Sequence, residues 1–387
     1  MKAKNIPDPV SSETQSLQPA RLSGGVDRRS FLKGLGVAGV SLAPATALLI
    51  REGEAKAQEV PPGLAQSDLD ILRFLAATEI LEADIWEQYL EFAVYNPAYS
   101  AGLRNLNRDM VQYVLDNNAD EASHQKFLNA FLVSAGSEAV SLDEFRTLTG
   151  SQAAGSKQLG RLTNLTQLNV DTGWYTWCRS TGNPDFGDSF KGPISITNQP
   201  AIPINDTDTP PATDLTPPIS TPHALRVQAI ANTATFHFAS VERCISSLYA
   251  SLIPKASGLV VLQILAAIGG SEVAHFQTWH EKVGHAVSKP LAGVTDPVTG
   301  LKFPDLNSPA FGGEFAFQTN LIMPEPCSFV SKDLPDCSII RPTLEANAGP
   351  LAVVDFFTKM GLFKGQTPQF FETLTALAGA AKKAQRQ

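Results

Sequence analysis

Cysteine, charge and basic residues are all scarce in this sequence. Only 4 of the 387 residues are cysteines, which excludes a scaffold built from disulfides. Charged residues make up 18% of the chain, and acidic residues outnumber basic ones by 38 to 30. This balance argues against a general nucleic-acid binder, which needs a basic surface. The hydrophobic fraction of 43% is high enough for a buried core, so we expect a folded chain.

Long apolar runs are also rare, and the one that stands out lies near the N-terminus, over residues 34–50. We therefore expect no membrane span in the rest of the chain. Residues 27–33 read Asp-Arg-Arg-Ser-Phe-Leu-Lys, and residues 55–57 form a small-x-small pattern, Ala-Lys-Ala. The combination resembles a twin-arginine export signal, although Asp27 stands where that pattern usually has Ser or Thr. It implies a signal peptide over residues 1–57 and a periplasmic or other extracytoplasmic protein; an uncleaved anchor is the alternative.

Helical periodicity dominates the remainder of the chain. Apolar residues recur at steps of three and four in four segments, which are residues 68–95, 103–133, 223–252 and 257–284. A further helix is expected over residues 367–384, because a Thr-Pro start signal precedes it and basic residues end it. The sequence therefore predicts a mainly α fold.

Two long connections interrupt the helical pattern. Residues 135–222 separate the second and third helices, and eight prolines lie between residues 193 and 222, so regular structure is not expected there. Such a connection suits a four-helix bundle in which one long crossover joins two helical hairpins. We assign residues 58–285 to this bundle. We expect residues 286–387 to form an irregular Pro- and Gly-rich extension followed by the C-terminal helix. Short strands are compatible with the extension.

Each of the four long helices carries a glutamate in the middle of its apolar stripe. A buried, unpaired carboxylate is costly, so such groups are neutralised, paired or bound to a cation. Two stripes add a histidine three residues later, in Glu121-Ala-Ser-His124 and Glu272-Val-Ala-His275. Positions i and i+3 of a helix point the same way, so each pair offers an oxygen and an imidazole to one point. The 18 glutamates and 6 histidines of the chain give only about 0.3 such pairs by composition.

The other two stripes share a different pattern. Glu79 has Trp86 seven residues on, and Glu242 has Tyr249 seven residues on. The chain is therefore two helical hairpins of one design, each with a glutamate on its first helix and Glu-x-x-His on its second. This pattern resembles the ferritin-like carboxylate-bridged dimetal proteins, such as rubrerythrins and bacterioferritins. The exported ferritin-like domain family that contains the desiccation-related proteins is the most similar group.

The resemblance implies a four-helix bundle that binds two divalent metal ions. Glu79 and Glu242 would be terminal ligands, Glu121 and Glu272 would bridge the metals, and each histidine would bind one metal. The implied ligands are Glu79, Glu121, His124, Glu242, Glu272 and His275. Oxygen and imidazole ligands favour Fe or Mn over a metal that prefers thiolate ligands. Zinc is an alternative occupant of the same site.

Glu82 complicates the first helix. It lies on the same stripe as Glu79 and has Tyr89 seven residues on, so periodicity alone does not choose between the two acids. The family's usual pattern favours Glu79, which leaves Glu82 as an alternative or an extra ligand.

The function implied by the resemblance is redox chemistry of iron, oxygen or peroxide, or protection against oxidative stress. A ferroxidase, a peroxidase and a manganese catalase-like enzyme all fit the motif. The alternative is a non-enzymatic stress or desiccation-related protein whose metal site is structural or vestigial. The expected partners are metal ions and small oxidants, with no nucleic acid, and a homodimer is compatible with an exposed bundle.

Several other residues receive plainer interpretations. Asp84, Glu87 and Glu91 are expected on a solvated helix face, and Asp120 is expected to point outward. Trp86, Tyr249 and Trp279 are expected to pack in the core. Cys327 and Cys337 lie ten residues apart and could form a disulfide in an oxidising compartment.

Overall fold

The computed structural model describes most of the chain after the expected signal peptide. The chain divides into a unit of residues 1–58 and a unit of residues 59–387, and all described residues belong to the second. The expected signal peptide, Cys178 and Cys327 lie outside the described residues, and only the backbone of Cys337 is described. The described residues are 63–172, 194–209, 214–306, 308, 324–325, 331, 333–335, 337–338 and 349–386.

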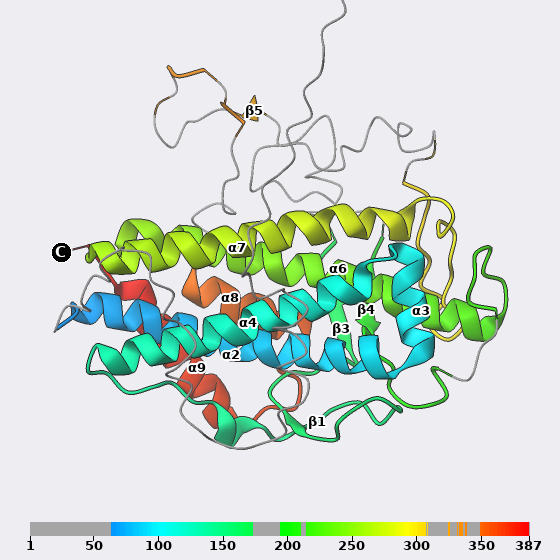
Figure 1. Cartoon of the computed structure of the whole chain (residues 1–387), viewed down its shortest axis with the longest axis horizontal. Helices are drawn as coiled ribbons and strands as arrows, with labels where there is room; N and C mark the ends of the chain where they lie inside the picture. The colour runs from blue at the N-terminus through cyan, green and yellow to red at the C-terminus, as the bar shows by residue number, and fades with distance from the viewer. Residues whose placement is uncertain are drawn as a thin grey trace, which may run out of the picture. The chain divides into compact units, whose positions relative to one another are not determined.

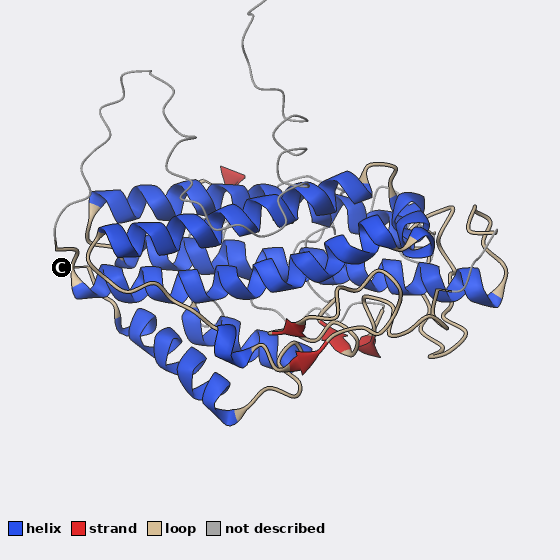
Figure 2. Ribbon diagram, turned by 60° about the horizontal axis from the view of Figure 1, so that its bottom comes forward, coloured by secondary structure: helices blue, strands red, loops and turns tan. Residues whose placement is uncertain are grey.

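The described residues are mainly helical, which confirms the predicted class (Figure 2). The long helices are α2 (Gln66–Tyr95), α4 (Met110–Ser134), α6 (Pro222–Leu252) and α7 (Leu259–Val283). The shorter helices are α3 (Pro97–Leu106), α8 (Pro350–Met360) and α9 (Pro368–Lys383), with 3-10 turns at Asp143–Phe145, Ile253–Lys255 and Gly284–Val287.

The strands are short and form three antiparallel pairs in the described residues. Leu148 of β1 lies opposite Arg161 of β2, and Leu168 of β3 lies opposite Gln199 of β4. The pairs are β1 (Leu148–Thr149) with β2 (Gly160–Arg161), β3 (Leu168–Val170) with β4 (Ile196–Gln199), and β5 (Pro324–Glu325) with β6 (Cys337–Ser338).

Local sequence signals explain where several helices begin. The hydroxyl of Thr221 accepts a hydrogen bond from the backbone N–H of Ala224, and Thr367 does the same for Phe370. A proline occupies the first turn of both helices, where its missing N–H costs nothing. The third, fourth and C-terminal predicted helices are therefore confirmed to within two residues at each end.

The second predicted helix was wrong at its start. Residues 103–133 were expected to form one helix, but α3 ends at Leu106 and α4 begins at Met110. Asn107 is extended, with φ −161° and ψ 142°, so the chain turns between the two helices. Helix α8 was not predicted, because its 11 residues are too few for a clear periodic signal.

The four long helices run side by side (Figure 1). Helix α2 packs against α4, α6 packs against α7, and α9 covers α2. One close approach depends on a glycine: a Cβ atom on Gly269 of α7 would lie 2.9 Å from the Cβ atom of Tyr249 on α6. The absence of a side chain at Gly269 therefore lets the middle of α7 approach closely to the last turn of α6.

Buried ion pairs fasten the 135–222 connection to α2. The guanidinium of Arg161 donates to both carboxylate oxygens of Glu91 at 2.7 and 2.6 Å, and both side chains are 1% exposed. Asp84 accepts hydrogen bonds from Arg146 and from the backbone and hydroxyl of Thr163. The expected solvated face was therefore wrong for Asp84 and Glu91, because the connection covers them. Glu87 stays near the surface and pairs with Lys157 at 2.7 Å.

One downstream segment corrects the expectation about membrane spans. Leu259–Val287 is long and apolar enough to cross a membrane by length and composition. A core helix of a soluble protein meets the same criterion, so the finding assigns no location. The segment also carries Glu272, which is fully buried in this structure.

Candidate metal centre

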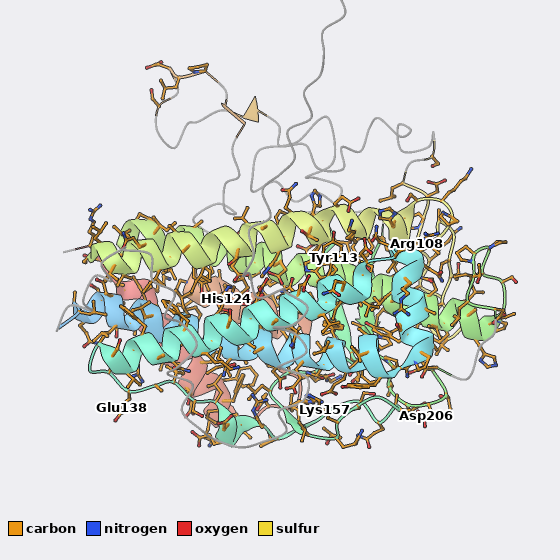
Figure 3. The ribbon with its side chains drawn as sticks, viewed as in Figure 1. Arg108, Tyr113, His124, Glu138, Lys157 and Asp206 are labelled. Carbon is orange, nitrogen blue, oxygen red and sulfur yellow. The ribbon has the colours of Figure 1, made fainter. Side chains whose placement is uncertain are left out.

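The four long helices bring all seven predicted site residues together. Their middles contribute the acids and histidines, and Figure 3 labels His124 on α4. The five acids are fully buried, whereas the side chains of His124 and His275 are 12% and 11% exposed. The residues are Glu79 and Glu82 on α2, Glu121 and His124 on α4, Glu242 on α6, and Glu272 and His275 on α7.

The first group of ligand-type atoms surrounds His124. Its Nδ1 atom lies 3.1 Å from Oε2 of Glu121, 3.0 Å from Oε1 of Glu272 and 3.4 Å from Oε2 of Glu79. One ligand atom from each of these four residues lies within 4.8 Å of all the others. A single N–H cannot point at three oxygens on three helices, but a cation among them can contact all four atoms.

The second group surrounds His275 in the same manner. Its Nδ1 atom lies 3.0 Å from Oε1 of Glu121, 3.5 Å from Oε2 of Glu242 and 3.6 Å from Oε2 of Glu272. Glu121 and Glu272 belong to both groups. Each of these two carboxylates turns one oxygen toward each histidine, so the two groups share a pair of carboxylates.

Several carboxylate oxygens of the seven site residues have no hydrogen-bond partner among the described residues. These are both oxygens of Glu82 and of Glu272, and Oε2 of Glu79 and of Glu242. Leaving buried carboxylates unpaired is costly, so they take up protons or a cation. Carboxylate and imidazole are ligands of divalent iron, manganese and zinc. The donor set therefore fits a metal ion.

Protons neutralise the cluster when no cation is bound. Burial raises the pKa of Glu242 to about 7, although the charge on His275 opposes the shift. Burial and then repulsion by Glu272 raise the pKa of Glu121 well above its usual value. Burial lowers the pKa of His124, but its hydrogen bond to Glu121 and its close contact with Glu272 outweigh that effect and raise the pKa to about 12. The metal-free cluster thus holds several protons that a cation would displace.

Glu82 lies outside both groups of candidate ligands. Burial, followed by repulsion from Glu121 and Glu272, raises its pKa well above the usual value. The structure therefore places Glu82 beside the cluster as a buried extra acid and does not place it among the atoms closest to either histidine.

Asn117 holds two of the carboxylates together. Its amide nitrogen donates to Oε1 of Glu121 at 2.8 Å and to Oε1 of Glu242 at 3.0 Å. Its amide oxygen accepts from the indole N–H of Trp279 at 2.8 Å, which fixes the orientation of the amide. Asn117 was not among the predicted site residues, although its position four residues before Glu121 places it on the same helix face.

Two of the aromatic residues expected in the core also support the cluster, one of them through Asn117. The hydroxyl of Tyr249 donates to Oε1 of Glu79. Trp86 stacks on Trp279 with ring centroids 5.3 Å apart. Tyr249 therefore supports Glu79 directly, and Trp279 supports Glu121 and Glu242 through Asn117. Both aromatic residues also fill the core.

The Nε2 atom of each histidine, the outer nitrogen that faces away from the glutamate carboxylates, is hydrogen-bonded across the site: His275 of α7 to a residue of α4, and His124 of α4 to a residue of α7. Nε2 of His275 lies 3.1 Å from Oδ2 of Asp120, and Nε2 of His124 lies 3.1 Å from the hydroxyl of Ser271. Asp120 was expected to point outward, and its side chain is 48% exposed, but one of its oxygens turns to His275. Both histidines are therefore oriented with Nδ1 toward the carboxylates.

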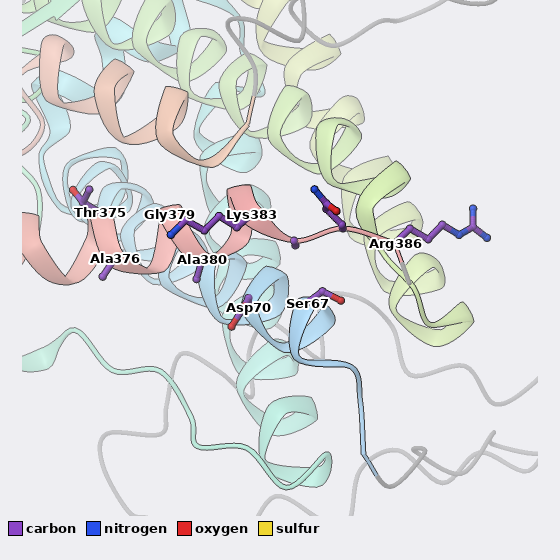
Figure 4. Close-up of a pocket in the computed structure, with 10 residues that line it drawn as sticks. Ser67, Asp70, Thr375, Ala376, Gly379, Ala380, Lys383 and Arg386 are labelled. Atoms are coloured by element: carbon purple, nitrogen blue, oxygen red, sulfur yellow. The ribbon is translucent and has the colours of Figure 1, made fainter.

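A groove elsewhere on the molecule lies between the start of α2 and the end of α9 (Figure 4). Asp70, Lys383 and Arg386 line it together with small side chains. None of the clustered acids or histidines lines this groove, and its charged side chains carry both signs. It therefore adds no candidate ligand to the cluster.

No protein-family model matches the sequence, and the comparisons with curated proteins and with solved structures likewise gave no match. The chemistry of the cluster is therefore the basis for a functional proposal.

Proposed function

We propose that α2, α4, α6 and α7 form a ferritin-like four-helix bundle that binds two divalent metal ions. Glu79 and His124 serve one ion, and Glu242 and His275 serve the other. Glu121 and Glu272 bridge the two ions. The observation that carries this proposal is that Glu121 and Glu272 each turn one oxygen to His124 and the other to His275. Four carboxylates balance the charge of two divalent cations.

Iron and manganese suit this set of oxygen and imidazole ligands, and either would supply one-electron redox chemistry toward oxygen or peroxide. The residues of the chain hold and orient the ions. Tyr249 fixes Oε1 of Glu79, and Asn117 fixes Oε1 of Glu242. The Oε2 atom of each acid lies on the side of its histidine and would be the oxygen that holds an ion. Full burial of the acids keeps bulk water from their charges.

We propose that the protein acts outside the cytoplasm, in redox chemistry of iron, oxygen or peroxide. The support is the paired arginines, apolar stretch and Ala-Lys-Ala pattern within residues 27–57. The twin-arginine route moves folded proteins, so a metal centre can be assembled before export. The second candidate is a structural metal site, which the unpaired buried oxygens also favour, because a cation would then contribute folding free energy.

Elemental analysis of purified protein tests the proposal. We expect about two Fe or Mn per chain in the unsubstituted protein, as for other bundles of this design. Glu121→Ala removes an oxygen from both groups, so it should reduce the content to below about one ion per chain. Glu138→Ala, at an exposed position outside both groups, is the matched control and should retain both ions.

Either of two results would contradict the dimetal proposal. One is an unsubstituted protein without bound metal after reconstitution with Fe(II) or Mn(II). The other is full metal content in Glu121→Ala. Turnover of peroxide or Fe(II) by the loaded protein then separates a redox enzyme from a structural site.

A further inference from the structure

We propose that the two metal positions bind cations with unequal affinity, the position at Glu242 and His275 being the tighter one. This inference rests on the proposed dimetal function. Its basis is the residue behind each histidine: a carboxylate, Asp120, supports His275, whereas a hydroxyl, Ser271, supports His124.

The cluster is otherwise closely matched on its two sides. Each group contains one histidine and three glutamates, and two of those glutamates are shared. His124 and His275 are exposed to the same small extent, 12% and 11%. Each terminal glutamate has one oxygen held by a neutral donor, Tyr249 for Glu79 and Asn117 for Glu242. These features therefore do not separate the two positions.

The buried acid beside the cluster does not separate them strongly either. Among the charges that act on Glu82, those of Glu121 and Glu272 come first. These are the two carboxylates that both groups share, so the field of Glu82 falls mainly on the common part of the centre.

The partners of the outer nitrogens differ in charge. Oδ2 of Asp120 can only accept, so Nε2 of His275 donates a charge-assisted hydrogen bond to it. The hydroxyl of Ser271 gives its one proton to the backbone oxygen of Ile268 at 2.7 Å, so it accepts from Nε2 of His124 as a neutral group. An imidazole that is hydrogen-bonded to a carboxylate is a stronger metal ligand than an imidazole that is hydrogen-bonded to a hydroxyl.

Asp120 and Ser271 occupy equivalent positions in the sequence, so the two can be compared directly. Asp120 precedes Glu121 and Ser271 precedes Glu272. Each lies one residue before its own Glu-x-x-His pair and bonds the histidine of the other pair. At this equivalent position one half of the chain has a carboxylate and the other a hydroxyl, so a reciprocal substitution can test the effect.

The experiment is a titration of the full metal-free chain with Mn(II), in which the electron paramagnetic resonance signal of free aqueous Mn(II) reports the unbound ion. We expect two binding steps whose affinities differ by about 10- to 100-fold, the range typical of a changed support behind a ligand. Glu242→Gln should remove the tighter step, and Glu79→Gln should remove the weaker one.

Asp120→Asn should weaken the tighter step by about 10-fold or more and leave the weaker step unchanged. Asp116→Asn is the matched control. It removes the same charge from the same helix, but its carboxylate is bonded to Gln112, so both steps should remain. Ser271→Asp is the reciprocal variant and should strengthen the weaker step. Thermal unfolding of each metal-free variant checks that it folds, and Ser271→Asp carries the test if Asp120→Asn does not fold.

Two equal binding steps in the unsubstituted protein would overturn the inequality and leave the dimetal proposal standing. The same holds if Asp120→Asn behaves like Asp116→Asn, or if it weakens the step that Glu79→Gln removes. An absence of Mn(II) binding would overturn both proposals, so the two failures are distinguishable.

Discussion

At the scale of single residues, Asn117 links the aromatic core to the candidate metal centre. Its amide is held by the indole of Trp279 and reaches carboxylates on two helices. The amide has one acceptor oxygen and two donor hydrogens. The three hydrogen bonds therefore allow only one of its two flip orientations. The positions of Glu121 and Glu242 therefore depend on a neutral side chain that is not itself a ligand.

Asn117→Leu keeps a side chain of similar size but removes these hydrogen bonds. We expect the free energy of unfolding to fall by about 1–3 kcal/mol, since buried polar groups lose their partners. We also expect metal affinity to fall by about 10- to 100-fold. Chemical denaturation and metal titration measure the two effects. Asn118→Leu, whose side chain points about 100° away on the helix, is the control, and equal losses in both variants would contradict the assigned role.

The candidate ligands could be predicted from the sequence because their signal is local. The spacing in Glu121-x-x-His124 and Glu272-x-x-His275 is set by the helix itself. The supporting bonds could not be predicted in this way, because Asp120 and Ser271 contact histidines 155 and 147 residues away in the chain. A pattern in one helix contains no information about what faces it from another.

At the scale of elements, the contact between α6 and α7 depends on the difference between two adjacent glycines. A Cβ atom on Gly269 would lie 2.9 Å from that of Tyr249, whereas one on Gly270 would have no atom within 4 Å. Tyr249 in turn donates to Glu79. Packing at Gly269 is thus coupled to the position of a candidate ligand on α2.

Gly269→Ala and Gly270→Ala should therefore change stability in opposite directions. Gly269→Ala overpacks the contact and should lower the free energy of unfolding by about 1–3 kcal/mol. Gly270 is exposed in the interior of α7, so Gly270→Ala should raise the free energy of unfolding by about 0.5–1 kcal/mol. Urea denaturation of both variants is the measurement. A stabilising Gly269→Ala would show that α6 and α7 are not this close.

The long helices and α9 were largely predictable from period and start signals, whereas α8 and the break before α4 were not. The way in which the 135–222 connection covers α2 was not predictable either. Thr221 and Thr367 cap their helices with their own side chains, which is a signal within four residues. Glu91 is buried because Arg161, 70 residues later, pairs with it. Asp84 is buried because residues 162–163 return to it. Such burial depends on contacts far apart in sequence.

At the scale of the whole molecule, the centre makes stability depend on pH in opposite ways with and without metal. The raised pKa of Glu242, about 7 from a usual 4.5, means that the folded protein binds this proton more tightly. The stabilisation is full below pH 4.5 and is lost as the pH rises through 7. His124, with a pKa raised to about 12, adds a further loss above its unfolded value of 6.5.

We therefore expect the metal-free protein to lose stability between pH 5 and pH 8, by roughly 3 kcal/mol for the Glu242 contribution alone. Glu272 makes stability rise with pH, but only at lower pH. The nearby His124 and His275 outweigh burial and hold the pKa of Glu272 at about 2, so its contribution to stability is lost as the pH falls below 4.5. A bound cation replaces the protons, so the rise in melting temperature with Mn(II) should be larger at pH 8 than at pH 5.5. An equal rise at both values would contradict proton displacement.

The most direct measurement is anomalous X-ray diffraction from crystals of the protein loaded with Mn(II) or Fe(II). The dimetal proposal requires two anomalous peaks per chain, one beside His124 and one beside His275. Glu121 and Glu272 should lie between the peaks, with one oxygen on each. A single peak, peaks away from these residues, or no peak in a fully reconstituted crystal would contradict it.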